Sequence, residues 1–149
     1  VELAKADGLT VVADASAEDE DLVTSFGADI VLPRGDNFAE LVREQFPQGI
    51  DGLADGAVLG EKVTHAVRDG GTFSSVRGWQ GTGERKIRFV ATSVREYASE
   101  LEKLEKLRKQ VEDGILTLRV ARTYQPEEAP EAHRLLEAGG IRGRLILEF

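Results

Sequence analysis

The chain of 149 residues contains no cysteine and only two histidines. The absence of cysteine excludes disulfide bonds and thiolate metal sites. His65 and His133 are far apart in the sequence, so a zinc site would require carboxylate ligands that no local motif supplies. No apolar run approaches the length of a membrane span, and the N-terminus lacks the pattern of a signal peptide. We therefore expect a cytoplasmic location and no membrane partner.

Positive charge is also scarce. Nineteen Lys and Arg residues stand against 27 Asp and Glu residues, which gives a formal net charge of -8. Because the basic residues are also scattered, a nucleic acid or an anionic membrane is not expected as a partner. The hydrophobic fraction of 41% and the charged fraction of 31% are typical of a globular protein. The length allows one domain with its own core, or one domain and a fragment of another.

An apolar, β-branched stretch ends in a carboxylate. We predict a strand over residues 9–15, buried on both faces as in a parallel sheet covered by helices. A helix end at 1–6 precedes it, and a helix at 17–26 follows, capped by Ser16. Asp14 stands at the end of this strand, where a carboxylate accepts hydrogen bonds from the diol of a nucleotide ribose. The alternative is a solvated acid at a strand end.

Predicted strands and helices then alternate along the chain. Strands are predicted at 28–32, 50–56, 72–76 and 87–91, and helices at 58–67 and from Asp36 or Asn37 to Phe46. A glycine-rich loop at 77–83 precedes the last of these strands. This alternation is typical of an α/β fold with a doubly wound parallel sheet.

The pattern changes after about Ala91, which predicts a second structural unit. Its first helix, at 97–113, carries an apolar stripe that we expect to pack on the sheet, with a short coiled coil as the alternative. Residues 116–123 alternate like an antiparallel strand. A helix that Pro126 or Pro130 opens and a strand at 144–149 complete the tail.

Seven short segments, taken together, are fairly specific. They are Val-Val-Ala-Asp-Ala-Ser at 11–16, Phe-Gly-Ala-Asp-Ile-Val at 26–31, Ile-Asp-Gly-Leu-Ala-Asp-Gly at 50–56, Val-Arg-Asp-Gly-Gly-Thr-Phe at 67–73, Glu-Asp-Gly at 112–114, Glu-Ala-His-Arg-Leu-Leu-Glu at 131–137 and Gly-Arg-Leu-Ile-Leu at 143–147. In this order and spacing the chain resembles the C-terminal portion of the medium-chain dehydrogenase/reductase superfamily, most of all its zinc-independent quinone oxidoreductase branch.

The resemblance implies two parts. Residues 1–114 would form a partial NAD(P)-binding Rossmann domain, and residues 115–149 the C-terminal segment of the catalytic, GroES-like domain. The first Rossmann strand and its glycine-rich turn have no counterpart in this chain, since the glycines of the loop at 77–83 follow the wrong strand.

That missing strand is central in the Rossmann order 3-2-1-4-5-6. The strands that end at Asp14 and Asp55 should therefore face a vacant slot, and open strand edges favour association. We expect the chain to be a homo-oligomer, to belong with a missing N-terminal segment, or to be completed by a partner or a rearranged segment. Catalysis by the chain alone is not expected.

The resemblance also implies which residues contact a cofactor. Asp14 would bind the adenosine ribose, and the acids at 18–21 provide no arginine to hold a 2′-phosphate, which favours NAD over NADP. Ala15 and Ser16 would contact the cofactor beside Asp14. Ala54, Asp55 and Gly56 would border the nicotinamide ribose, and Ser74, Ser75 and Val76 would border the nicotinamide. Arg144 would stand where relatives carry a lysine. Ordinary turns, loops and exposed charges are the alternatives.

The function implied is hydride transfer between a nicotinamide dinucleotide and a small carbonyl, enone or quinone substrate, without zinc. The cofactor would supply the chemistry, and no catalytic acid or base is identified. A second hypothesis is a non-catalytic Rossmann-like fragment that associates through its open sheet edge. A methyltransferase-like fold is a third, although the tail after Ala91 fits it poorly.

Overall fold

The computed structural model describes residues 1–149, which form two compact units, Val1–Glu105 and Lys106–Phe149. Every strand pair in both units is parallel, which confirms the predicted α/β class. No helix combines the length and the apolar character needed to span a membrane. The first unit contains α1 (Glu2–Ala6), β1 (Val12–Ala15), α2 (Glu20–Ser25), β2 (Ile30–Pro33), α3 (Phe38–Gln45), β3 (Ile50–Asp55), α4 (Glu61–Thr64), β4 (Val67–Ser75), a 3₁₀ turn at Glu84–Lys86, β5 (Arg88–Ala91) and α5 (Val94–Tyr97).

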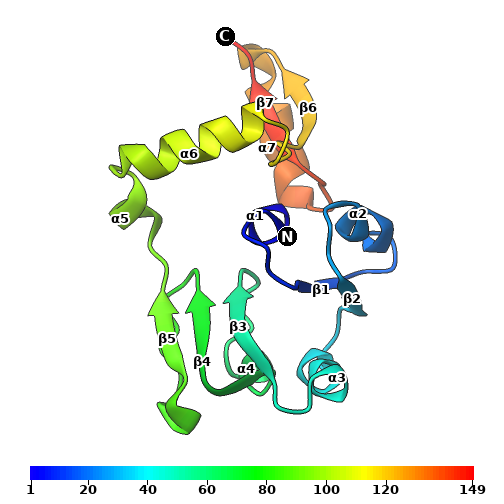
Figure 1. The fold of residues 1–149 in the computed structure, drawn as a ribbon. Helices are drawn as coiled ribbons and strands as arrows, with labels where there is room; N and C mark the ends of the chain where they lie inside the picture. Colours follow the sequence, from blue (N-terminus) through cyan, green and yellow to red (C-terminus); the bar gives the residue numbers. More distant parts are fainter. The chain divides into compact units, whose positions relative to one another are not determined.

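The larger sheet has the order β3-β4-β5, and its three strands run in the same direction side by side (Figure 1). Near its start β4 carries extra residues, because Ile50 pairs with Val67 whereas Gly52 pairs with Thr72. Gly71 lies in this bulge, where a Cβ atom would come within 2.6 Å of the Val67 side chain and 2.9 Å of a backbone carbonyl. The bulge therefore requires a glycine at this position.

β1 and β2 form a separate two-stranded sheet. β1 pairs with β2 alone, and β3 pairs with β4 alone, so each has one unpaired edge, as the missing central strand predicts. The expectation that β1 is buried on both faces is wrong: Val12, Ala13 and Asp14 are only half-buried. A strand with a single neighbour is less covered than one in the middle of a sheet.

Two apolar clusters hold the first unit together. One joins Leu32 of β2, Ala39 and Val42 of α3, and Ala66, with Val12 and Leu53 among the half-buried residues around it. Both sheets therefore contribute to the same core beside α3. The other cluster centres on Phe73 of β4, which is fully buried among residues of α4, β4 and β5.

Two helices differ from their predictions. The helix expected at 58–67 is reduced to α4, because Val58 and Gly60 have positive φ angles (61° and 56°) that a right-handed helix does not contain. The helix expected at 97–113 is divided into α5 and α6 (Leu101–Glu112), since Leu101 N bonds to Ser99 O in a tight turn. No residue of α6 is buried.

The second unit pairs β6 (Val120–Tyr124) with β7 (Arg144–Leu147), and between them lie a 3₁₀ turn at Pro126–Glu128 and α7 (Ala129–Ala138). The antiparallel interpretation of residues 116–123 is therefore wrong. Side chains alternate with a period of two in both kinds of sheet, so the pattern alone does not distinguish them. The intervening helix brings β7 back in the same direction, as parallel pairs require.

Candidate functional site

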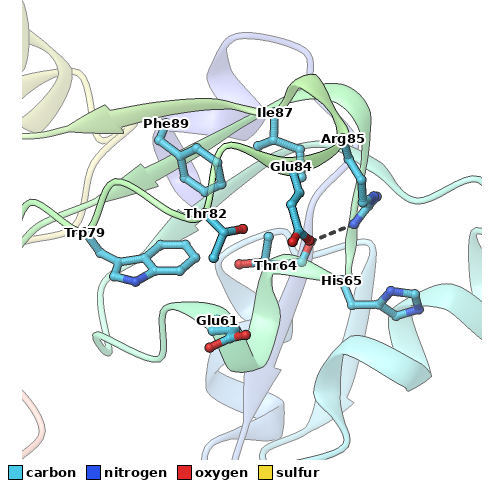
Figure 2. Close-up of a pocket in the computed structure, with 9 residues that line it drawn as sticks. All are labelled: Glu61, Thr64, His65, Trp79, Thr82, Glu84, Arg85, Ile87 and Phe89. Atoms are coloured by element: carbon cyan, nitrogen blue, oxygen red, sulfur yellow. Dashed lines mark hydrogen bonds between the residues drawn. The ribbon is translucent and has the colours of Figure 1, made fainter.

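The first unit contains two cavities of about 200 Å³ each. One lies beside the N-terminal ends of β4 and β5, and Figure 2 shows Trp79 and Phe89 next to each other in its wall. Ligands of open α/β sheets bind at the carboxyl ends of the strands, so its position does not favour it as the site. It is lined by Glu61, Thr64, His65, Trp79, Thr82, Glu84, Arg85, Ile87 and Phe89.

The aromatic side chains of this first cavity have a packing role. Trp79 meets Phe73 and Phe89 edge to face, with ring centroids 5.1 and 5.2 Å apart. Such contacts add to the stabilisation that burial of the rings provides. Arg85, in the same wall, is held by Asp69 Oδ1 at 2.8 Å and by the carbonyl of Val67. These side chains are engaged with each other and with the backbone.

The second cavity lies at the carboxyl ends of β1 and β2, where a nucleotide is expected. Its wall is formed by the last residues of the two strands, the residues directly after them and the first residue of α2: Ala15, Ser16, Ala17, Glu20, Val31, Leu32, Pro33 and Arg34. Asp14 lies in β1 opposite Leu32, immediately before this wall. The three predicted residues Asp14, Ala15 and Ser16, which are consecutive in the sequence, thus lie at this end of β1, and two of them line the cavity.

Asp14, which directly precedes the cavity-lining Ala15, retains a free acceptor. Its Oδ2 atom accepts a hydrogen bond from Arg34 Nε at 2.7 Å, whereas Oδ1 has no hydrogen-bond partner. The side chain is 39% exposed, so a ligand can reach it. A carboxylate oxygen in this state can accept a hydrogen bond from a ribose hydroxyl. This geometry fits the adenosine end of a dinucleotide.

Ser16 does not cap the next helix as predicted. Its hydroxyl donates to Asp19 Oδ2 at 3.0 Å, and Asp19 is the residue at the N-cap position of α2. The helix begins at Glu20, three residues later than predicted. The loop between β1 and α2 is longer as a result, and this loop forms one side of the second cavity.

Asp55, expected beside the nicotinamide ribose, is buried with only 4% of its surface exposed. Its two carboxylate oxygens accept hydrogen bonds from Leu59 N at 3.0 Å and Gly60 N at 2.8 Å. The carboxylate thereby holds the loop in which Val58 adopts its positive φ, a conformation that is costly for a β-branched residue. Both oxygens of Asp55 are thus engaged within the protein.

The remaining predicted residues fall into two groups. Ala54 and Asp55 pair with Ser74 and Ser75 at the carboxyl ends of β3 and β4, so the structure brings these four together. The hydroxyl groups of Ser74 and Thr92 hydrogen-bond at 2.8 Å.

Ser75 is fully buried, whereas Val76 and Gly56 are exposed. Arg144 belongs to the second unit, where it is exposed at the start of β7.

The chain supplies no metal-binding cluster: nowhere do three or more His, Cys, Asp or Glu side chains gather so that they could hold a metal ion. His65 lines the first cavity and His133 lies in α7. The donor set of this chain therefore does not fit a zinc site.

Sequence reasoning missed Arg34. The residues that directly follow Asp14 in the sequence include no arginine, whereas Arg34 reaches Asp14 from the end of the neighbouring strand β2. Its backbone N–H extends the β1–β2 ladder by bonding to Ala15 O at 2.8 Å, which sets its side chain beside the carboxylate. The signal for Arg34 is the parallel pairing of β1 and β2, because two strands that end together place the residues after them side by side.

Many solved structures resemble this chain, among them three oxidoreductases. An NAD-dependent alcohol dehydrogenase is 26% identical with a TM-score of 0.81, over 99% of this chain and 46% of its own. A protein described as a probable oxidoreductase from Mycobacterium abscessus is 25% identical with a TM-score of 0.80, over 99% and 49%. A mycobacterial quinone oxidoreductase, 23% identical with a TM-score of 0.81 over 98% and 51%, has the same fold. This chain thus spans about half the length of these structures.

A comparison with curated proteins finds no match. The model of a protein family described as zinc-binding dehydrogenase matches residues 26–147, which is most of the chain. The chain therefore belongs to the zinc-binding dehydrogenase family, within the medium-chain dehydrogenase/reductase superfamily.

Proposed function

We propose that this chain is the nucleotide-binding portion of an NAD(P)-dependent oxidoreductase of the alcohol dehydrogenase/quinone oxidoreductase type, with residues 1–114 forming part of the NAD(P)-binding domain. The observation that carries the proposal is the free Oδ1 atom of Asp14 beside a cavity at the ends of two parallel strands. Family membership supports it, and so does the likeness to an NAD-dependent alcohol dehydrogenase. When bound, the nicotinamide would accept or donate a hydride, with a carbonyl, enone or quinone compound as the substrate.

The residues of this chain would hold the adenosine end of the cofactor. Asp14 would accept hydrogen bonds from the ribose hydroxyls, which favours NAD, and the loop at Ala15 and Ser16 would cover the base. The carboxyl ends of β3 and β4, at Ala54, Gly56, Ser74 and Val76, would border the nicotinamide end. Catalysis would require a further segment of protein that contributes the glycine-rich turn for the pyrophosphate. The proposed hydride transfer would not use zinc.

We further propose that residues 115–149 belong to the catalytic domain of the same enzyme, and that Arg144 is the residue of this segment that reaches toward the cofactor. The division of the structure into two units supports a boundary in this part of the chain. The composition of the chain favours a cytoplasmic location for this enzyme.

The test is binding of ADP-ribose, which carries the adenosine end of the cofactor, measured by calorimetry with the 149-residue chain. We expect saturable binding that Asp14→Ala weakens about tenfold, because the variant lacks the acceptor for the hydroxyls. Asp36→Ala is the matched control, since Asp36 is an exposed acid outside the second cavity that pairs with Lys62. Equal affinities of the two variants and the original chain would contradict the assignment of Asp14.

A second candidate function follows from the free edges of β1 and β3. Unpaired backbone groups on such edges are satisfied by another strand, so the chain could act as a non-catalytic module that associates through them. Sedimentation velocity over a range of concentrations distinguishes the candidates. Stable self-association of a chain that does not bind ADP-ribose supports this second function, whereas a monomer that binds ADP-ribose excludes it.

A further inference from the structure

The first cavity lies outside the nucleotide site, and the proposed function gives it no role. Its walls come from α4, from the segment that connects β4 to β5, and from the start of β5. A cavity of about 150 Å³ is large enough to hold a benzene molecule. At about 200 Å³, this cavity therefore has room for one ring with a short side chain.

One side of the cavity is apolar and already formed. Trp79 and Phe89 are half-buried, with their ring centroids 5.2 Å apart and their planes at 86°. Gly60 supports the indole, since a Cβ atom at Gly60 would lie 3.4 Å from the Trp79 ring. Small-molecule sites are typically built from such rigid aromatic and aliphatic surfaces with a few polar groups at defined places.

The polar groups of the cavity include three free acceptors. Glu61 and Glu84 are exposed, and neither carboxylate forms an ion pair or accepts a hydrogen bond within the protein. The hydroxyl of Thr82 has no partner either. Figure 2 shows Glu84 directed from the 3₁₀ turn toward α4, which carries Glu61. The acids thus belong to two separate elements that border the same space.

The charge of the wall is negative. Arg85 is the one cation in it, and Asp69 compensates its charge through Nε at 2.8 Å. The terminal nitrogens of Arg85 are bonded to backbone carbonyls of α4 and β4. The ring of His65 points away from Trp79 and Phe89 (Figure 2). The charges of the two glutamates therefore remain uncompensated in the wall.

We propose that the first cavity binds a small primary ammonium compound that carries an aromatic or apolar group on a short chain. The ammonium group offers three donors, and it would bind on the side of Glu61, Glu84 and Thr82, where acceptors are free. The apolar group would lie against Trp79 and Phe89, whose ring faces also attract a cation. This site does not depend on the proposed function, because it shares no residue with the second cavity.

The test uses 2-phenylethylamine as the probe, and the fluorescence of Trp79, the only tryptophan, as the signal. We expect a saturable change. 2-Phenylethanol has the same shape without the charge and should bind about fivefold more weakly. The double variant Glu61→Gln/Glu84→Gln should weaken binding of the amine about tenfold and that of the alcohol less than twofold, because it removes only the charges. Each single variant should give a smaller loss.

Glu40→Gln is the matched control, since Glu40 is an exposed acid of α3 without a partner and outside both cavities. It should leave the affinity for the amine unchanged. An excess of ADP-ribose should not displace the amine, because the nucleotide site is elsewhere. The proposal is wrong if the amine gives no saturable signal, if the amine and the alcohol bind equally, if ADP-ribose displaces the amine, or if the cavity variants bind it no more weakly than Glu40→Gln.

Discussion

Lys5 Nζ donates hydrogen bonds to both carboxylate oxygens of Asp29, at distances of 2.9 and 2.8 Å. The same carboxylate accepts a bond from Val11 N at 2.7 Å, and Lys5 also bonds to Leu9 O. One acid before β2 thereby connects α1, the segment that leads into β1, and β2. This group of contacts sets the position of β1, and therefore of Asp14 at its end.

The Lys5–Asp29 pair predicts a dependence on pH. The hydrogen bonds from Lys5, and then that from Val11, lower the pKa of Asp29 below its usual 3.8. Because the folded-state pKa is the lower one, the contribution to stability is present above about pH 3.8 and is lost as the pH falls through the folded-state pKa. NMR titration of the Asp29 carboxyl should give a midpoint below 3.8, and Lys5→Met should return it toward that value.

Lys103→Met provides the control for this titration. Lys103 pairs with Glu100, so this substitution removes the same charge from another part of the chain. It should leave the midpoint of Asp29 unchanged. A midpoint that is the same in the original chain and in Lys5→Met would show that the pair does not exist in solution.

The glycine-rich loop predicts a difference between two glycines. Both Gly78 and Gly81 have a positive φ, of 71° and 64°, but only Gly81 lies against a side chain. A Cβ atom on Gly81 would overlap the Phe89 ring, whereas one on Gly78 would meet nothing within 4 Å. We expect Gly81→Ala to lower the free energy of unfolding by about 2–4 kcal/mol, from backbone strain and overpacking together.

Gly78→Ala should cost only the backbone part, about 1 kcal/mol. Urea unfolding followed by the fluorescence of Trp79, the only tryptophan, measures both variants. Equal losses would mean that the loop does not pack on Phe89.

We expect the loss of the Arg43 side chain, in α3, to destabilise the fold by more than the loss of its charge alone. Its guanidinium donates to three backbone carbonyls, those of His65 at 2.6 Å and of Pro47 and Val67 at 3.0 Å. Arg43→Ala should cost about 2–3 kcal/mol of unfolding free energy, because three carbonyls lose a charged donor and that of Val67 is in a partly buried position. Arg43→Lys should lose nearly as much, since an ammonium group cannot span three carbonyls in one plane.

Arg68→Ala is the comparison for Arg43, because Arg68 pairs with the exposed carboxylate of Asp51. Exposed pairs contribute about 0–1 kcal/mol, so chemical denaturation should show a small change. The prediction for Arg43 is refuted if Arg43→Lys is as stable as the original chain.

The course of the first unit could be predicted from the sequence because its signals are local. β3 begins and ends within one residue of the predicted strand, which Gly49 precedes and Gly56 closes. α3 lies within the predicted helix and begins after Asn37, one of the two residues predicted to cap it. Apolar periodicity and turn residues determine such elements within a few neighbours.

The candidate site could be predicted only in part, because its contacts join residues distant in the sequence. Asp14 stands at the predicted strand end, but its partner Arg34 is twenty positions away. The role of Asp55 depends on a loop whose residue Val58 adopts a conformation that its residue type disfavours. Neither pairing across strands nor a strained loop leaves a signal in hydrophobic periodicity.

Asp55 predicts a graded effect of two substitutions. Asp55→Ala removes both acceptors and leaves the Leu59 and Gly60 N–H groups without partners, which should cost about 2–3 kcal/mol of unfolding free energy. Asp55→Asn keeps one acceptor oxygen and should cost about half as much. Hydrogen exchange of the Gly60 amide, which lies in a buried bond, should become faster in Asp55→Ala.

Asp51→Ala is the control on the same strand, because the Asp51 side chain is 90% exposed and forms only a surface pair with Arg68. It should leave both the stability and the exchange of Gly60 almost unchanged. If Asp55→Ala behaves like Asp51→Ala, the carboxylate does not hold the loop. Asp55 would then be free to take the place beside the nicotinamide ribose that the family resemblance implies.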